Sequence, residues 1–203
     1  MQAKINRFSW NYTHLLMCVN IGEFMSVKSK NVIAKTLLNL MEQYRFDEIT
    51  ISEVCANTSL VRKTFYNNFT SKGDVITYIV DSLIKEYMDM IMKQKQFNQR
   101  EMSLLFFQFG QKNKAIISLL IKNNLFYVFQ NMFNEQLPSL NILISGNMLN
   151  NLSNDDIAYI FAFNSAGVTR MLELWIKTGL KKSPKEMSDL YTVAVKDVRK
   201  IML

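Results

Sequence analysis

One stretch, Thr50 to Lys72, constrains the fold more than any other, because it predicts two short helices around a tight turn. Thr50 and Glu53 form a T-x-x-E capping box, which starts the first helix. Apolar residues then follow at the i, i+3, i+4 spacing of a buried helical face. Turn-prone residues separate this helix from a second short one. A unit of this kind can place its second helix in the major groove of DNA.

The second helix of this unit is predicted between Val61 and Asn68. At about 100° per residue, Val61, Phe65 and Phe69 share one face, which we expect to be buried. The opposite side carries short donors and one flat aromatic ring, groups that suit phosphates and base edges. The residues that we expect to contact DNA are Thr50, Arg62, Lys63, Thr64, Tyr66, Asn67, Asn68 and Lys72.

Several of these residues also have simpler interpretations. Tyr66 could pack at the end of the helix, and Asn67 and Asn68 could belong only to the polar surface. Lys72 could be a solvated residue in the first turn of the following helix. Because Lys is mildly unfavourable at a helix N-terminus, its position favours a phosphate partner instead.

The segment Thr64–Lys72, TFYNNFTSK, resembles the signature of the TetR family of transcriptional regulators. That signature is Thr, an apolar residue, Tyr, any residue, a polar residue, Phe and then Ser-Lys. The preceding amphipathic helix, Lys30 to Tyr44, lies where the family has its first helix. The resemblance covers about residues 28–90. It implies an all-α protein of about nine helices, with an N-terminal three-helix DNA-binding domain and a C-terminal helical domain for ligand binding and dimerisation.

Two residues depart from the family's pattern. Ser59 stands where the family usually has Gly, and a left-handed backbone there would cost about 1 kcal/mol. Val61 stands where the family usually has Ser or Thr, and Val cannot cap a helix. Thr58 or Ser59 is then the alternative cap. These differences bear on the geometry of the turn.

A second resemblance lies between Ala166 and Met187. This segment is similar to a C-terminal domain of TetR-like regulators, including those grouped as dihydroxyacetone kinase regulators, in which a Gly, a Trp-containing helix and a G-x-x-x-S-P-x-E-M turn recur. In the broader family the last two long helices form the dimer interface, and the small residues here could instead pack within the chain. The resemblance implies that the interface contains Ala158, Ala162, Ala166, Trp175, Leu190, Ala194 and Val198.

The domains expected are an N-terminal extension over 1–27, a helix-turn-helix domain over 28–72 and a regulatory and dimerisation domain over 73–203. The extension lacks periodicity. One hypothesis is that Met25 starts the native protein. The alternative is an arm whose basic residues lie near phosphates, although chain ends are usually mobile.

Start and stop signals predict helices throughout the rest of the chain. A long helix over about residues 72–95 connects the two domains, and three or so helices follow between about residues 100 and 144. Two more helices complete the chain. The signals are, in order, Ser71 with Asp74, Ser153, Gly179, and Ser183 with Pro184 and Glu186.

Composition supports long helices with few loops, since 203 residues hold only six Gly and two Pro. Cys18 and Cys55 have neither a disulfide framework nor a metal spacing, so a reducing, cytoplasmic location is expected. No run of about 18 apolar residues predicts a membrane span. The net charge of +7 is spread along the chain, so it permits attraction to DNA without establishing it.

An enzyme finds no support in the residues. His14 is the only histidine, and it lies in the extension. Asp155 and Asp156 are better interpreted as first-turn partners of a helix dipole than as an acid and base pair. Neither a Gly-rich phosphate loop nor a nucleophile elbow is present. We therefore expect no catalytic residue, no cofactor and no metal.

The sequence thus predicts a homodimeric regulator, more specifically a repressor, that binds a palindromic operator in double-stranded DNA. A ligand or partner on the C-terminal domain would tilt the connecting helix and weaken operator binding. The alternative is a co-regulator that serves as a protein-binding platform, with weak or no operator affinity. A pocket for an apolar or neutral effector, or simply the core, could be formed by Phe106, Phe107, Phe109, Phe126, Phe129, Met132 and Phe133.

Overall fold

The computed structural model describes residues 21–94, 98–144 and 153–201, and every regular element in these ranges is an α-helix. The expectations for the N-terminal extension therefore fall mostly outside the described residues, as does the side chain of Val198. In chain order the helices are α1 (Ile21–Gln43), α2 (Ile51–Ala56), α3 (Arg62–Tyr66), α4 (Lys72–Met92), α5 (Gln99–Lys112), α6 (Lys114–Lys122), α7 (Phe126–Ile144), α8 (Asn154–Lys177) and α9 (Pro184–Ile201).

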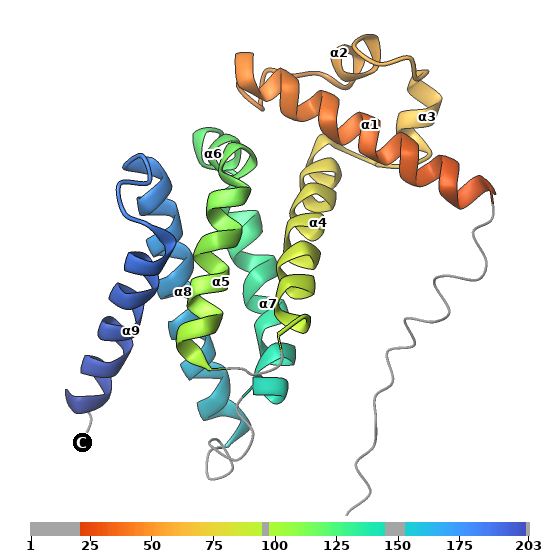
Figure 1. The fold of residues 1–203 in the computed structure, drawn as a ribbon. Coiled ribbons are helices and arrows are strands. Elements are labelled where there is room, and N and C mark those ends of the chain that lie inside the picture. The colour runs from red at the N-terminus through yellow and green to blue at the C-terminus, as the bar shows by residue number, and fades with distance from the viewer. Residues whose placement is uncertain (1–20, 95–97, 145–152, 202–203) are drawn as a thin grey trace, which may run out of the picture.

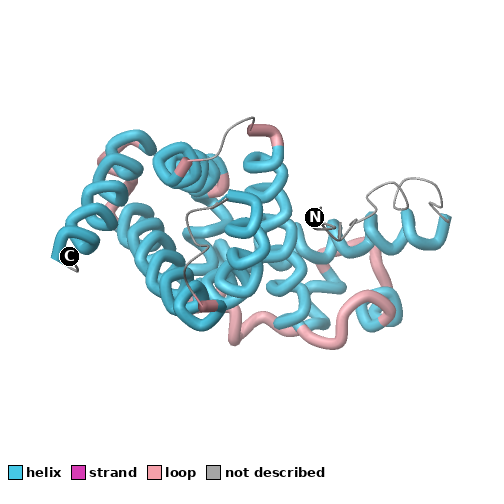
Figure 2. Tube along the Cα trace, turned by 90° about the horizontal axis from the view of Figure 1, so that it is seen from below, coloured by secondary structure: helices cyan, strands magenta, loops and turns pink. Residues whose placement is uncertain are grey.

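The helices form a small head, α1 to α3, and a larger body, with α4 running from one into the other (Figure 1). Helix α1 packs on α2, α3 and α4, and it also reaches α6 of the body. Within the body, α5 packs mainly against α9, and α7 packs mainly against α8. Seen from below, the body helices lie side by side while the head projects to one side (Figure 2). The head is thus attached to the body along α4 and beside α6.

Local start signals place most of the helix N-termini. The side chains of Thr50, Ser71, Asn98 and Ser153 each accept a hydrogen bond from a backbone N–H in the first turn that follows. Ser183 does the same ahead of Pro184. The predicted starts of α2, α4, α8 and α9 are confirmed. Helix α1 begins earlier than predicted, because the polar run before Lys30 continues the helix instead of leading into it.

Two helices end with residues in the left-handed region of the backbone. After α6, Asn124 has φ 58°, and the Leu125 N–H donates to the Leu120 carbonyl at 2.7 Å. After α8, Gly179 has φ 81°, which confirms it as the predicted stop. Both ends have the hydrogen-bond pattern of a Schellman motif, which satisfies the last carbonyls of a helix.

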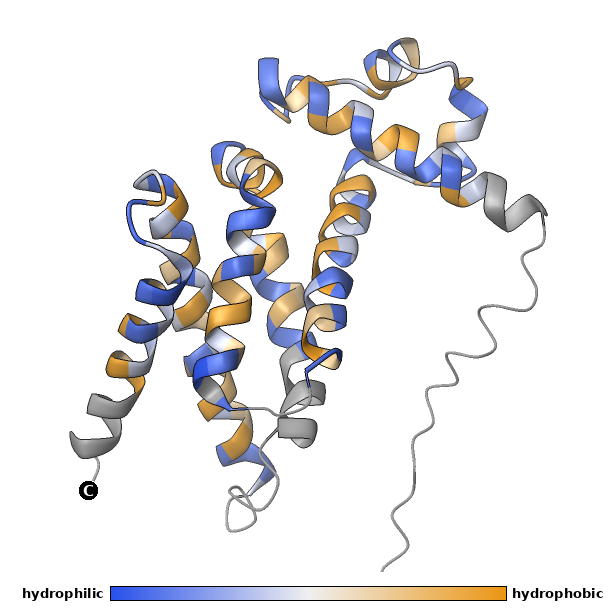
Figure 3. Cartoon of the chain, in the orientation of Figure 1, coloured by the Kyte–Doolittle hydropathy of each residue, from blue (hydrophilic) through white to orange (hydrophobic). Residues whose placement is uncertain are grey.

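Aromatic rings fill the interior of the body. Phe129 stacks on Phe109, Phe126 and Phe133, with ring centres 5.5–6.2 Å apart. Tyr87 of α4 meets this group, and Phe106 lies 5.0 Å from Phe133 between ring centres. All of these rings are buried, so each contributes about 1.5–3 kcal/mol of apolar burial. In Figure 3 each long helix carries both apolar and polar residues, as helices around a shared core require.

Among the described helices, none has the combination of length and apolar character needed to cross a bilayer.

Candidate nucleic-acid interface

The first helix of the head's helix-turn-helix unit is started by the predicted capping box. The Thr50 Oγ1 accepts a hydrogen bond from the Glu53 N–H at 3.1 Å, and the Glu53 carboxylate accepts one from the Thr50 N–H at 2.6 Å. The Thr50 backbone and hydroxyl donors hold the pKa of the Glu53 carboxyl below its usual value. The exposed Thr50 side chain is therefore engaged in starting α2.

The turn between α2 and α3 is closed by Thr58. Its Oγ1 donates to the Cys55 carbonyl at 2.9 Å and accepts from the Leu60 N–H at 3.1 Å. Ser59 has an ordinary negative φ, so the turn needs no glycine there. Val61 stands at the N-cap of α3 without a side-chain hydrogen bond, so neither Thr58 nor Ser59 caps this helix.

Helix α3 is held to the head by its phenylalanines. Phe65 and Phe69 are buried, with ring centres 6.0 Å apart, and Phe69 meets Tyr78 of α4 edge-on. The predicted burial of Val61 is wrong, since its side chain is 68% exposed. Val61 precedes the helix, so the helical rotation that relates Phe65 to the core does not apply to it.

The outward side of α3 presents four exposed residues. The Arg62 guanidinium lies 6.0 Å from the centre of the Tyr66 ring, and the Tyr66 side chain is 50% exposed. Lys63 lies one residue further along, and Asn67 forms the C-cap. A guanidinium, an ammonium, a phenol and an amide thus face outward together, and these groups can donate to phosphates and base edges.

Asn68, one of the residues predicted for DNA contact, is engaged inside the head instead. The Asn68 Oδ1 accepts from the Ser26 hydroxyl of α1 at 2.8 Å, and its Nδ2 donates to the Thr64 carbonyl at 2.7 Å. Asn68 therefore ties α1 to the end of α3. Thr64 is half-buried, so less of it reaches the outward side.

Lys72 also has protein partners where a phosphate was expected. Its Nζ donates to the Phe46 carbonyl at 2.6 Å and to the Ile49 carbonyl, and it lies 4.6 Å from the centre of the Phe46 ring. These groups belong to the loop between α1 and α2. Peptide carbonyls that no helix satisfies need donors, and the Lys72 side chain supplies one. The phosphate interpretation of Lys72 is therefore replaced by a role in closing this loop.

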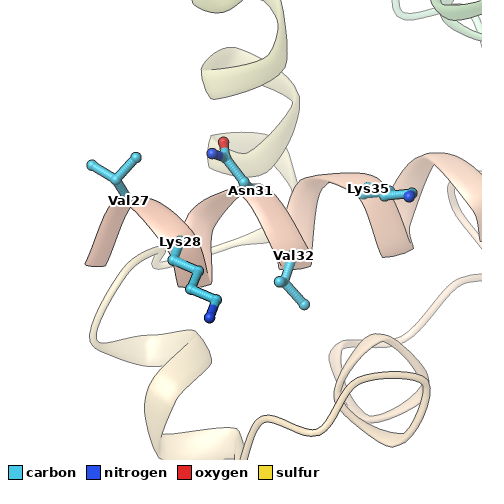
Figure 4. A pocket seen from close by; sticks show the side chains of 5 residues that line it. All are labelled: Val27, Lys28, Asn31, Val32 and Lys35. Atoms are coloured by element: carbon cyan, nitrogen blue, oxygen red, sulfur yellow. The ribbon is translucent and has the colours of Figure 1, made fainter. Parts of the chain in front are cut away.

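Helix α1 adds basic residues that the sequence interpretation missed. An open hollow of about 360 Å³ is lined by Val27, Lys28, Asn31, Val32 and Lys35 (Figure 4). Lys28 and Val32 point to the side on which α3 lies, while Asn31 points toward α4 and accepts a hydrogen bond from the Tyr78 hydroxyl. Lys28 and Lys35 are exposed. Their spacing of seven residues on one helix face was the available signal.

Helices α8 and α9 carry exposed apolar side chains. The expected interface residues Ala158, Ala162, Ala166, Leu190 and Ala194 are exposed. The sequence interpretation missed larger neighbours, of which Tyr159 is 77% exposed and Phe163 is 59% exposed. Leu174 and Val193 extend the exposed stripes. Helix α9 lies on the side of the body away from α4 (Figure 1).

Trp175 does not belong to this surface. Its side chain is buried, its indole N–H donates to the Lys182 carbonyl at 3.0 Å, and its ring meets Phe107 edge-on. The predicted place of Trp175 at an interface is therefore wrong. It packs α8 against α5 and closes the turn that leads to α9.

Comparison with known proteins agrees with this architecture. Residues 97–197 match the family model TetR_C_8, described as a transcriptional regulator C-terminal region. A stretch of 104 residues is 22% identical to the HTH-type dhaKLM operon transcriptional activator DhaS of Lactococcus lactis subsp. lactis (strain IL1403), covering 50% of this chain and 48% of that protein. The chain thus aligns with about half the length of this curated relative.

Two solved structures share the fold. The TetR transcriptional regulator from Streptococcus agalactiae 2603V superposes with a TM-score of 0.61 at 15% identity, over 86% of this chain and 97% of that chain. The dihydroxyacetone kinase operon activator DhaS superposes with a TM-score of 0.59 at 17% identity, over 86% and 98%. The predicted all-α, TetR-like fold is confirmed, and so is the resemblance of the C-terminal region to regulators of the dihydroxyacetone kinase type.

Proposed function

We propose that this chain, which belongs to the TetR family of transcriptional regulators, binds an operator in double-stranded DNA through α3 and acts as a homodimer. One observation carries this proposal. Arg62, Lys63 and Tyr66 face outward from a helix whose phenylalanines are buried in the head. Such a helix can enter a groove without unfolding anything that holds it in place.

Different parts of the head would make different kinds of contact. Lys63 and Arg62 supply charge-assisted donors, while Asn67 supplies an amide that can pair with a base edge. Lys28 and Lys35 of α1 extend the positive charge beyond α3. Phosphate contacts set the position of the head on the duplex, and base contacts select the sequence. We assign the first role to the lysines and the second to Arg62 and Asn67.

The homodimer would use the exposed stripes of α8 and α9. Tyr159, Phe163 and Leu190 are large apolar side chains on the surface, and small residues such as Ala162 and Ala166 between them allow close helix approach. Exposed large apolar side chains grouped on a helix are typical of an interaction site. A two-fold dimer places two α3 helices on one duplex, about 34 Å apart for successive major grooves.

Control of operator binding would come from the body. The aromatic rings pack against one another between α4, α5 and α7, and hollows lie on α1 and beside the end of α6. Because these rings contact one another closely, we favour a partner or ligand that binds outside them over an apolar effector held among them. Such an effector would change operator affinity by favouring one orientation of the heads over another.

The direction of regulation has two candidates. The sequence interpretation favours a repressor, whereas two similar proteins are named as operon activators. The co-regulator that acts as a protein-binding platform is the remaining alternative, and the exposed apolar stripes would equally serve it. A reporter gene placed behind the selected operator distinguishes the first two, because an activator raises its expression and a repressor lowers it.

Titration with DNA tests the proposed function. The purified protein is mixed with random duplexes and with a palindromic duplex selected by the protein from a random library, each at two salt concentrations. A regulator binds the selected duplex more tightly, with a component that remains at the higher salt concentration. Equal and weak binding to every duplex would overturn operator binding and support the platform.

A further inference from the structure

Two backbone groups of the head form hydrogen bonds with side chains at the end of α6 in the body. The Lys122 Nζ donates to the Glu42 carbonyl in the last turn of α1 at 3.0 Å. The Asn123 Oδ1 accepts from the Phe46 N–H, in the loop after α1, at 2.7 Å. Two consecutive residues of the body thus hold the end of α1 and the loop that follows it.

These two residues are themselves held in place. Asn123 is the C-cap of α6, and its Nδ2 donates back to the Leu119 carbonyl at 2.9 Å. The left-handed residue Asn124 and the Leu125 N–H close the helix end just beyond it. Because both bonds fix the asparagine side chain, its Oδ1 stays directed at the Phe46 N–H. The contact is a defined hydrogen bond between ordered groups.

The same loop is also bound to α4. The Phe46 carbonyl accepts from Lys72 at 2.6 Å, while the Phe46 N–H donates to Asn123. Phe46 therefore lies between the start of α4 and the end of α6. A polar hollow of about 210 Å³ opens beside it, lined by Arg45, Phe46, Asp47, Lys122, Asn123 and Asn124.

We propose that Lys122 and Asn123 form a latch, with the Asn123–Phe46 hydrogen bond as its central element, that sets the orientation of the head relative to the body. The head is attached along α4, where α1 packs on that helix. A second attachment at α6 defines the angle. In the dimer the latch fixes the distance between the two α3 helices before DNA is bound. Less conformational entropy is then lost when both helices bind one duplex, which strengthens binding.

This inference rests on the proposed function, and it names the contact through which a change in the body reaches the DNA-binding head. A movement of the α6–α7 turn breaks or shifts the bond to Phe46 before it disturbs the buried aromatic core. The contact is a partly buried hydrogen bond between a backbone N–H and a side-chain oxygen, so opening it costs less than separating buried aromatic rings. The latch is therefore the contact between head and body that opens at the lowest free-energy cost, and we assign control of the head orientation to it.

A matched pair of variants tests the latch. Asn123→Ala removes the bond to Phe46 together with the local bond to the Leu119 carbonyl. Asn113→Ala is the control, because Asn113 caps α5 with the same kind of bond to the Phe109 carbonyl at 3.2 Å. Its second bond, to the Glu86 carboxylate in the body part of α4, reaches no residue of the head loop. Asn123→Asp keeps the acceptor oxygen and serves as the rescue. Each protein is titrated with the selected palindromic duplex and with a half-length duplex that carries one repeat.

Asn123→Ala should bind the palindromic duplex about three- to tenfold more weakly than wild type, and the half-length duplex within about twofold. Asn113→Ala should match wild type on both duplexes, and Asn123→Asp should restore most of the loss. Equal palindrome affinity for Asn123→Ala and Asn113→Ala would overturn the latch. Equal loss on both duplexes would also overturn it, since the effect would then lie in the head alone.

Hydrogen exchange at the Phe46 amide examines the latch without DNA. Asn123→Ala should lose protection at this amide, and Asn113→Ala should keep it. If wild type selects no duplex at all, the proposed function fails, and this exchange measurement still decides whether the latch holds the head. Unchanged protection in Asn123→Ala would end the inference whatever the DNA results are.

Discussion

The ammonium group of Lys72 lies 4.6 Å from the centre of the Phe46 ring and donates to the carbonyl of the same residue. One side chain at the start of α4 thus closes the loop that joins α1 to α2. The contact combines a cation–π interaction with a charge-assisted hydrogen bond. It orients the helix-turn-helix unit on the helix that carries it, and it uses the charge that the sequence interpretation assigned to DNA.

Lys72→Met should destabilise the head while leaving the salt dependence of DNA binding unchanged. Methionine keeps most of the apolar length but leaves the loop carbonyls without their donor, at a cost of about 1–3 kcal/mol. Chemical denaturation measures the loss, and binding at several salt concentrations gives the slope. A slope lowered by about one, with stability unchanged, would return Lys72 to a phosphate contact.

Lys63→Ala should show the opposite behaviour. Its side chain is exposed on α3, so its loss should lower the salt slope by about one and change stability by no more than about 0.5 kcal/mol. Lys114→Ala, which removes an exposed lysine from α6 in the body, is the matched control and should leave the slope unchanged. Identical slopes for the two variants would argue against α3 as the DNA-contacting helix.

The capping carboxylate of Glu53 should make the head sensitive to acid. Its pKa is lowered in the folded protein by the Thr50 donors, so its stabilising effect is fully present above the ordinary value of 4.5 and is lost as the pH falls through the folded pKa. Glu53→Gln keeps the capping geometry but does not titrate. Thermal unfolding should therefore find wild type more stable than Glu53→Gln near neutral pH, with the difference shrinking below 4.5. A constant difference across this range would exclude the carboxylate as the cause.

Leu190→Asp should break the proposed dimer. The side chain is 45% exposed on α9, so a charge there costs little in the folded monomer but much in an apolar interface. Sedimentation should show about half the wild-type mass at micromolar concentration. Tyr127→Asp, at a comparably exposed aromatic on α7, is the control and should keep the dimer. An unchanged mass for Leu190→Asp would refute the assignment of this surface.

Gly110→Ala should destabilise the body. A Cβ at this position would lie 2.4 Å from Leu172 Cδ1, where α5 passes α8, and Leu172 is fully buried. Overpacking of this kind costs about 1–3 kcal/mol. Gly73→Ala places its Cβ at an ordinary 3.4 Å contact on the exposed side of α4, so its melting temperature should stay close to that of wild type. Equal melting temperatures for Gly110→Ala and wild type would show that α5 and α8 move apart to accept the added methyl group without a loss of stability.

The parts of this fold that were predictable from sequence are those set by neighbours in the chain. Thr50, Ser71, Ser153 and Ser183 bond to groups within three residues, so the local pattern was sufficient. The outward position of Tyr66 followed from helical rotation in the same way.

What escaped prediction depends on distant partners. The carbonyls that bind Lys72 lie 23 and 26 residues away, and the Phe46 amide lies 77 residues from Asn123. Trp175 was misplaced for a related reason. Both sides of α8 are rich in apolar residues, and helical periodicity cannot say which of two apolar sides meets the core and which meets a partner.

The setting of Trp175 makes it a natural optical probe. The chain has two tryptophans, Trp10 and Trp175, so replacing Trp10 with Phe would leave a single tryptophan, which can be excited selectively over the tyrosines. Its indole is shielded from water, bonded across the α8–α9 turn and in edge contact with Phe107 of α5. A red shift of its emission would therefore signal loosening where three helices meet, and events confined to the head would pass without a spectral change.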